Sequence, residues 1–189
     1  MAYGAVKNAG LKPDDNVVVV GTRELGLMAI QLVKAITGVN IIAMDQDDQK
    51  LDVAKKNGAD TTINSEKEVP VKAIMELTNK LGADAVIGFV NASRTVKTDV
   101  EFLRRRGKLV LVGHPGGELK LSLVMMSRRA HRVIGSCNGT ISDLIELVSQ
   151  AKRGVVKPVV SNRFKLDQAA EALTMVSKGK IIGRGIINP

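Results

Sequence analysis

A short turn with a glycine at each end carries the clearest chemical signal in this sequence. The turn reads GTRELG over residues 21–26 and follows the apolar run NVVVV. A strand-to-helix turn binds the pyrophosphate of a dinucleotide when glycine stands at its first, third and sixth positions. The first glycine makes the turn, the third lets the backbone approach the phosphates, and the sixth lets the helix pack on the strand. Gly21 and Gly26 therefore predict the two outer roles of a dinucleotide-binding turn.

The middle of this turn departs from the dinucleotide pattern. Arg23 stands where the pattern has its third-position glycine, so its Cβ is expected to crowd a bound pyrophosphate. Glu24 follows in the first turn of the expected helix, where a carboxylate suits the helix dipole but repels a dianionic pyrophosphate. We therefore expect any dinucleotide binding to be weak. An alternative is that Arg23 swings outward and binds phosphate as a cation.

An acidic residue at the end of the next expected strand supplies the second half of the pattern. Asp45 lies 24 residues after Gly21 and ends the run NIIAMD. A carboxylate there accepts hydrogen bonds from the adenosine ribose hydroxyls and disfavours a 2′-phosphate. The sequence therefore predicts NAD as the preferred cofactor. The alternative is that Gly21, Gly26 and Asp45 only shape the fold.

Short β-branched runs alternate with longer segments of helical periodicity, which predicts a parallel sheet covered by helices. The expected strands are residues 16–21, 40–44, 61–64, 84–90, 108–113 and 131–136. The expected helices are residues 24–37, 47–58, a segment within 70–81, 94–106 and 141–153. This pattern predicts the α/β class with a doubly wound six-stranded parallel sheet, the Rossmann fold, whose ligands bind at the carboxyl ends of the strands.

The closing stretch of the chain has a different organisation. Residues 157–164 and 180–188 are typical of strands, and residues 166–179 are typical of a helix. Pro158 marks a boundary before them. We therefore expect a dinucleotide-binding Rossmann domain with an N-terminal entry helix over residues 1–157, and a C-terminal strand-helix-strand extension over residues 158–189.

Composition excludes several classes of protein. The 189 residues, 44% of them hydrophobic, are enough to bury a sizeable core. The apolar runs are only a few residues long, so no membrane span is expected, and the N-terminus lacks the apolar segment of a secretory signal. Cys137 is the only cysteine, which excludes an intramolecular disulfide and favours a reducing, cytoplasmic location.

The net charge of +9 is concentrated in the second half of the chain. Residues 1–93 hold 10 basic and 12 acidic side chains, whereas residues 94–189 hold 18 basic and 7 acidic ones. Basic clusters at 104–106, 128–132 and 152–157 raise the alternative of nucleic-acid binding. One Tyr, three Phe and no Trp leave few rings on which bases could stack, so nucleic acid is an unlikely partner.

Several long segments resemble the coenzyme-binding domain of zinc-type medium-chain alcohol dehydrogenases. The resemblance begins in LKPDDNVVVVGTRELGLMAIQLVKAITGVNIIAMDQDDQKLDVAKKNGAD and continues through GADAVIGFVNASRTV, GKLVLVGHPGG, VIGSCNGTISDL and KIIGRGIINP. MAYGAVKNAG is similar to the helix through which the family's chain enters its coenzyme domain. The resemblance covers essentially the whole sequence and implies a nicotinamide-dinucleotide cofactor.

The resemblance also implies that the metal-holding part of the family is missing here. In the family, a preceding GroES-like domain carries the catalytic zinc ligands and the proton relay. This sequence offers only Cys137, His114 and His131, without an HExxH or CxxC motif, so no zinc is expected. The resemblance therefore implies that the chain alone is inactive, although a separate polypeptide that supplies the catalytic domain remains an open alternative.

The resemblance carries over a set of cofactor-binding positions and no catalytic or metal-binding residue. These positions are Gly21, Thr22, Arg23, Leu25 and Gly26 in the phosphate turn, Asp45 and Lys50 at the ribose, Val90 and Asn91 at the adenine side, Val112, Gly113 and His114 beside the nicotinamide, Cys137 and Asn138 at the carboxamide, and Arg184 at the pyrophosphate.

The resemblance implies a homodimer through the edge of the strand at 131–136, because family members continue their sheet across a twofold axis. An exposed strand edge needs a partner or a cover. The alternative is that Arg128, Arg129 and Arg132 blunt this edge. The final segment raises a similar question, because its isoleucines lose their family neighbour unless the tail docks locally or another chain covers it. These are Ile181, Ile182, Ile186 and Ile187.

Two functions follow from the residues and the resemblance. The first is a nicotinamide-dinucleotide-binding module of an alcohol dehydrogenase-like oxidoreductase, without hydride transfer of its own. The alternative is a cofactor-free Rossmann-like dimerisation or interaction protein whose phosphate turn is blocked by Arg23 and Glu24.

Overall fold

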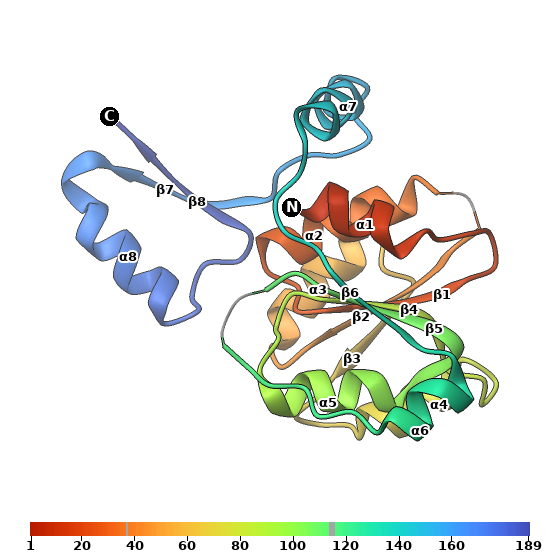
Figure 1. Cartoon of the computed structure of the whole chain (residues 1–189). Coiled ribbons are helices and arrows are strands. Elements are labelled where there is room, and N and C mark those ends of the chain that lie inside the picture. The colour runs from red at the N-terminus through yellow and green to blue at the C-terminus, as the bar shows by residue number, and fades with distance from the viewer. Residues whose placement is uncertain (37, 114–115) are drawn as a thin grey trace.

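A six-stranded parallel sheet forms the centre of the structure, a computed structural model that describes residues 1–36, 38–113 and 116–189. Its strands are β1 (Asn16–Val20), β2 (Asn40–Asp45), β3 (Thr61–Asn64), β4 (Ala83–Gly88), β5 (Leu103–Leu111) and β6 (Arg132–Gly135). They lie in the order β3-β2-β1-β4-β5-β6 (Figure 1). This order confirms the predicted doubly wound sheet, and the direction of winding reverses between β1 and β4.

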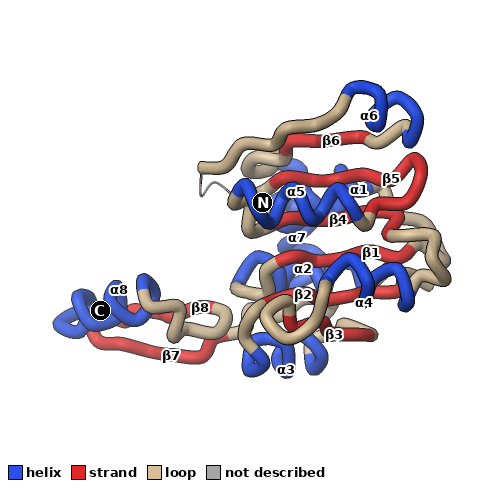
Figure 2. Tube along the Cα trace, turned by 90° about the horizontal axis from the view of Figure 1, so that it is seen from below, coloured by secondary structure: helices blue, strands red, loops and turns tan. Residues whose placement is uncertain are grey.

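Helices cover both faces of this sheet (Figures 1 and 2). They are α1 (Ala2–Ala9), α2 (Glu24–Lys34) and α3 (Asp48–Lys56) on one face, and α4 (Pro70–Leu77), α5 (Ser93–Glu101) and α6 (Leu123–Arg129) on the other. Successive side chains of a strand point to opposite faces. Val17 and Val19 of β1 therefore pack into the core under α1 to α3, whereas Val18 and Val20 pack under α4 and α5. This division explains why β1 is apolar throughout.

Helix α7 (Ile141–Lys152) lies outside α1 (Figure 1) and exposes a row of apolar side chains, whereas its Leu147 packs against the main core. A capping box between Thr140 and Asp143 begins the helix. Four apolar side chains at helical spacing are 45 to 80% exposed. They are Ile141, Leu144, Ile145 and Val148, and we call them the α7 stripe. No described residue buries the α7 stripe, so α7 leaves an apolar surface without a partner.

The C-terminal extension forms a small unit of its own beside the main sheet (Figure 1). It consists of β7 (Val160–Lys165), a 3₁₀ turn (Leu166–Gln168), α8 (Ala169–Ser177) and β8 (Arg184–Asn188), with β7 and β8 paired in parallel. Phe164, Ala172 and Ile181 make its core. Ile182 instead packs against the main core, whereas Ile187 is 40% exposed. The tail therefore docks locally in part.

One predicted boundary is wrong, because the helix expected at 94–106 ends at Glu101 and β5 begins at Leu103. Phe102 and Leu103 are both buried, and the Phe102 carbonyl accepts a hydrogen bond from the Ala83 amide at 2.8 Å. The strand is irregular at this point, since the pairing of β4 with β5 shifts register and Arg106 has a φ of 65°. The extended pairing with β4 thus replaces the last turn of the expected helix.

Two further elements differ from the expectation. Helix α6 was not expected, and it begins where the Ser122 hydroxyl accepts a hydrogen bond from the Met125 amide. The last strand is shorter than the strand expected over residues 180–188, because Gly183 turns the chain with a φ of 76°. Strand β8 begins only at Arg184, whose amide donates to the Val159 carbonyl at 2.8 Å.

Helix α2 and strand β1 meet at a contact that only glycine permits. A Cβ on Gly26 would lie 1.9 Å from the Gly21 carbonyl oxygen. Where a helix has space for the side chain, replacing Gly by Ala stabilises the protein by about 0.5–1 kcal/mol. At position 26 the overlap with the Gly21 carbonyl makes the same replacement destabilising. We expect Gly26→Ala to lower the free energy of unfolding by about 2 kcal/mol or more, as measured by urea denaturation.

Gly135→Ala is the matched control, because a Cβ there would meet nothing within 4 Å. Equal stability of the two variants would contradict this role of Gly26.

Candidate functional site

A cleft of about 240 Å³ opens at the carboxyl ends of β1, β2 and β4. Its walls come from the ends of these strands, the loop after β3 and one side of α5. The lining includes Gly21, Asp45 and Val90, three of the positions predicted from the sequence. This is the edge of a doubly wound sheet where ligands bind, next to the point where the strand order reverses.

The phosphate turn is shaped by its two glycines. Gly21 has a φ of 89°, which glycine adopts readily, and a Cβ there would lie 2.7 Å from Cγ2 of Val90. Its amide donates to the Met44 carbonyl at 2.8 Å and ties the turn to β2. Gly26 lies in the first part of α2 and Leu25 is half-buried against the main core. The N-terminus of α2 thus points toward the cleft edge, as in anion-binding turns.

Arg23 and Glu24 occupy the beginning of α2. Arg23 is the exposed N-cap residue of the helix and makes no side-chain capping hydrogen bond. Glu24 stands in the first turn. Neither side chain forms a hydrogen bond or ion pair with another residue that the structure describes. Both charges therefore stand at the helix N-terminus, where a pyrophosphate would bind.

Asp45 is held in place by donors from two directions. Its Oδ2 accepts from the Thr22 amide at 2.7 Å and from the Thr22 hydroxyl at 3.0 Å. Its Oδ1 accepts from the amides of Gln46 at 2.8 Å and Asp47 at 3.3 Å. Thr22 itself is fully buried, so it fixes the carboxylate from behind the turn. The acid at the end of β2 is thus an ordered acceptor in the cleft wall.

Lys50 lies behind this acid rather than in the cleft lining. Its side chain is only 12% exposed, and its Nζ lies 3.3 Å from Oδ2 of Asp47. A Cβ on Gly179 would approach the same Nζ to 3.9 Å, so the C-terminal extension comes close to α3 here. The C-terminal extension therefore approaches the main domain beside Lys50.

Asn91 joins the ends of two neighbouring strands. Its Nδ2 donates to the Gly113 carbonyl at 2.8 Å, which ties the loop after β4 to the end of β5. Val112 is buried in the main core, whereas Val90 is 42% exposed at the cleft. His114, predicted beside the nicotinamide, lies outside the described residues.

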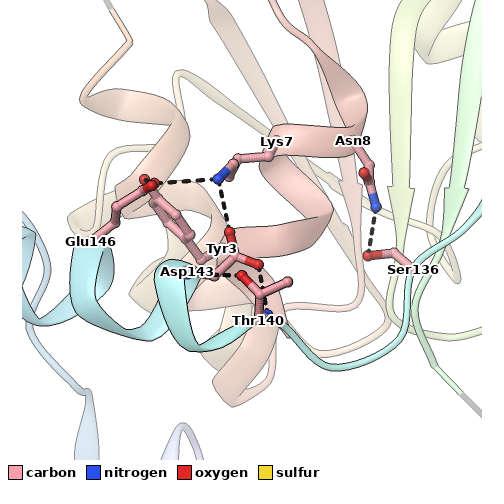
Figure 3. Close-up of polar contacts among 7 residues, drawn as sticks. All are labelled: Tyr3, Lys7, Asn8, Ser136, Thr140, Asp143 and Glu146. Atoms are coloured by element: carbon pink, nitrogen blue, oxygen red, sulfur yellow. Dashed lines mark hydrogen bonds and ion pairs between the residues drawn. The ribbon is translucent and has the colours of Figure 1, made fainter.

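The segment after β6 lies against α1 and is tied to it by a hydrogen bond (Figure 3). Asn8 Nδ2 donates to the Ser136 hydroxyl at 3.1 Å, and a Cβ on Gly4 would lie 3.2 Å from the Asn138 carbonyl oxygen. Cys137 and Asn138 are exposed between these anchors. The predicted carboxamide positions therefore stand on a backbone that packs closely against α1.

Charged groups on α1 and α7 hold these helices together (Figure 3). Lys7 Nζ lies 2.8 Å from Asp143 and 3.3 Å from Glu146, and the Tyr3 hydroxyl donates to Glu146 at 2.6 Å. The hydrogen bond from Lys7 lowers the pKa of Asp143 to about 2, and that from Tyr3 lowers the pKa of Glu146. Both carboxylates are therefore ionised at neutral pH, which is the form that holds α7 in place.

Arg184 lies in the C-terminal extension, where it is exposed at the first position of β8. It is not among the residues that line the cleft. Its assignment to the pyrophosphate stays a prediction.

Sequence reasoning missed part of the cleft wall. Arg94, Thr95 and Thr98 of α5 line it, together with Ser65 and Glu66 after β3. No motif marks these residues. Their signal is positional, because α5 starts at the carboxyl end of β4, and Thr98 is a helical neighbour of both Arg94 (i, i+4) and Thr95 (i, i+3).

The residues described by the structure contain no group of three or more His, Cys, Asp or Glu side chains placed to hold a metal ion. Over the same residues, none of the helices combines the length and apolarity that a membrane crossing requires.

The sheet order, the glycine turn and the acid at the end of β2 define a Rossmann domain of the dinucleotide-binding class. The chain belongs to the zinc-binding dehydrogenase family, whose model matches residues 25–153. That match and the comparisons below identify it with the coenzyme-binding part of alcohol dehydrogenases, as the sequence resemblance predicts.

Two curated relatives and one solved structure illustrate this membership. The NAD-dependent alcohol dehydrogenase of Sulfurisphaera tokodaii is 38% identical over 99% of this chain and 54% of its own length. The alcohol dehydrogenase of Geobacillus stearothermophilus is 35% identical over 98% and 53%. The crystal structure of the alcohol dehydrogenase from Aeropyrum pernix is 36% identical, with a TM-score of 0.93 over 100% of this chain and 54% of that one. The chain thus spans about half the length of the relatives that it matches.

A buried acid lies under the cleft edge without any hydrogen-bond partner. Asp99 of α5 is fully buried, and neither of its carboxylate oxygens has a partner among the described residues. Oδ1 of Asn91 is unpartnered as well, and both side chains approach the space that a Cβ on Gly88 would occupy. Burial raises the pKa of Asp99 to about 8, so this carboxyl keeps its proton at neutral pH.

We expect Asp99→Asn to stabilise the fold at pH 8 more than at pH 5. The unfolded chain releases this proton near pH 4, whereas the folded chain holds it until about pH 8, so the contribution of Asp99 to the free energy of unfolding falls between these values. The asparagine amide has nearly the shape of the protonated carboxyl and does not titrate. Urea denaturation at both pH values, with the exposed Asp167→Asn as control, measures the difference. An equal effect of Asp99→Asn at the two pH values would contradict the buried proton.

Proposed function

We propose that this chain is the NAD-binding part of an alcohol dehydrogenase-like oxidoreductase and that it transfers no hydride by itself. The observation that carries the proposal is the cleft where the Gly21 turn faces the ordered carboxylate of Asp45. The family and the printed names of the relatives support NAD as the dinucleotide. When bound, the nicotinamide ring would supply the hydride donor or acceptor.

The cleft residues divide the work of holding the dinucleotide. The α2 N-terminus would bind the pyrophosphate through backbone amides, since Gly21 keeps the turn open. Asp45 would accept from the ribose hydroxyls and, as a carboxylate, would repel the 2′-phosphate of NADPH. Thr22 would keep that carboxylate in position while the cofactor binds.

Arg23 and Glu24 support weak rather than tight binding. Arg23 brings a Cβ and a long side chain to the position that needs bare backbone, and Glu24 adds a negative charge beside it. In the limiting case the turn admits no cofactor, and the chain acts as an interaction protein.

The α7 stripe supports a partner that carries the catalytic chemistry. The relatives are about twice as long as this chain, and the described residues offer no metal-binding group. An apolar surface of four side chains on one helix is typical of an interface. We propose that a catalytic domain, on the same or a separate polypeptide, covers the α7 stripe.

Strand β6 supports a homodimer. It ends the sheet, pairs with β5 alone among the described strands, and leaves Val133 37% exposed. An edge of this kind would pair with its twofold mate and continue the sheet across the dimer.

We expect the double variant Arg23→Gly/Glu24→Gly to bind NADH about tenfold more tightly than the wild type, or better, because the backbone of the turn becomes accessible. Isothermal titration with NADH, NADPH and ADP-ribose measures this, and Asp45 predicts NADH ahead of NADPH. The control Glu118→Gly/Arg153→Gly changes the same residue types at exposed positions outside the turn. Unchanged NADH affinity after the reversion would refute the steric and electrostatic block. Failure of both proteins to bind any of the three ligands would favour the interaction protein.

We expect Val133→Lys to weaken self-association about tenfold or more, because a charged lysine on an edge strand opposes edge-to-edge pairing. Sedimentation velocity over a concentration series measures the dimer fraction. Ile145→Lys, on the α7 stripe, is the control. Dissociation by Ile145→Lys alone would place the interface on α7 and overturn the β6 dimer.

A further inference from the structure

A second hollow, of about 310 Å³, lies on the opposite face of the sheet from α7. It is bounded by α5, α6 and residues 119–122, and none of its lining residues belongs to the dinucleotide cleft. Its volume is that of a small ligand site. We call it the α5–α6 groove.

The floor of the α5–α6 groove is apolar. Val100 and Leu119 pack on the core beneath α4 and α5 and present their remaining surface to the groove. Leu121, Met125 and Met126 complete the floor. Unbranched methionine side chains adapt to the shape of an apolar ligand, so this floor suits a flexible hydrocarbon body.

The rim of the groove is positively charged. Lys97, Lys120 and Arg129 line it against a single acid, Glu101. None of the three basic groups forms an ion pair with a described residue, and Arg129 makes only a 3.4 Å hydrogen bond to the Leu103 carbonyl. The groove therefore combines an apolar floor with three cations that form no ion pair with a described residue.

His131 adds a polar atom that lacks a partner. Its Nε2 is the only buried side-chain nitrogen without a hydrogen-bond partner among the described residues. The same side chain lines the groove. Burial, and after it the neighbouring Arg129 charge, lowers the pKa of His131.

We propose that the α5–α6 groove binds an amphipathic anion, with a hydrocarbon body of about the length of octanoate and a carboxylate head. The floor would bury the hydrocarbon, and Arg129 with its neighbouring lysines would pair with the head. A nucleic acid fits this groove poorly, because no Phe, Tyr or Trp side chain lines it. The site goes beyond the proposed function, since it stands apart from the dinucleotide cleft.

Methionine-methyl NMR on the full chain tests this site directly. Octanoate is expected to shift the methyl signals of Met125 and Met126, assigned by single substitution to Leu, in a saturable titration. 1-Octanol has the same body without the charge, and acetate has the head without the body. Both are expected to bind about tenfold more weakly or not at all.

Charge variants separate the anion site from a simple apolar groove. Arg129→Gln and Lys97→Gln are each expected to weaken octanoate binding several-fold to about tenfold and to leave the response to 1-octanol unchanged. Arg153→Gln, an exposed arginine after α7, is the control. Equal shifts with octanoate and 1-octanol, insensitivity to Arg129→Gln, or no shift at all would each overturn the proposal. Shifts that depend on protein concentration and follow dimer formation would assign the groove to a second copy, which also overturns it.

Discussion

The contact between the Gly21 carbonyl and Gly26 is the constraint on which the rest of the site depends. A carbonyl occupies the space where any other residue at position 26 would place its Cβ, so α2 can approach β1 closely. That approach directs the N-terminus of α2 to the end of the sheet and leaves the cleft between β1, β2 and β4. Thr22, between the two glycines, is thereby brought against Asp45, so the same turn both forms the cleft and orders its acid. A third glycine, at position 23, would complete the phosphate-binding pattern of the turn, but this chain carries Arg23 there.

Much of the fold could be predicted because burial on both faces leaves a strong mark on sequence. Val17 to Val20 are apolar without interruption since each face of β1 is covered by helices. The boundary near residue 102 could not be predicted in this way. Phe102 and Leu103 satisfy a helical pattern, and only the pairing with Ala83 selects extended backbone. Helix α6 escaped prediction because it is short and contributes no buried residue, so it has no core-facing period.

The candidate site was predictable only where a motif or resemblance marked it. Gly21 and Asp45 could be identified from spacing, and the structure brings both to one cleft. Thr98 and Arg94 carry no motif, and they reach the cleft because α5 happens to present that side. Asp99 is a different case, because an acid in a polar helix gives no sign of burial. Its environment depends on Gly88, the last residue of the preceding strand, which leaves room beside β4.

Helix α7 reverses the usual arrangement of a surface helix, with ionised groups inward against α1 and aliphatic groups outward. The consequence concerns colloidal behaviour. A net charge of +9 keeps copies of the isolated chain apart at low ionic strength, while the outward aliphatic row draws them together. At ionic strengths of about 0.1–0.15 M, added salt screens the charge repulsion beyond roughly 8–10 Å and does not weaken the attraction between the aliphatic rows. Solubility of the free polypeptide is therefore governed by ionic strength, and a binding protein that shields the row would remove that dependence.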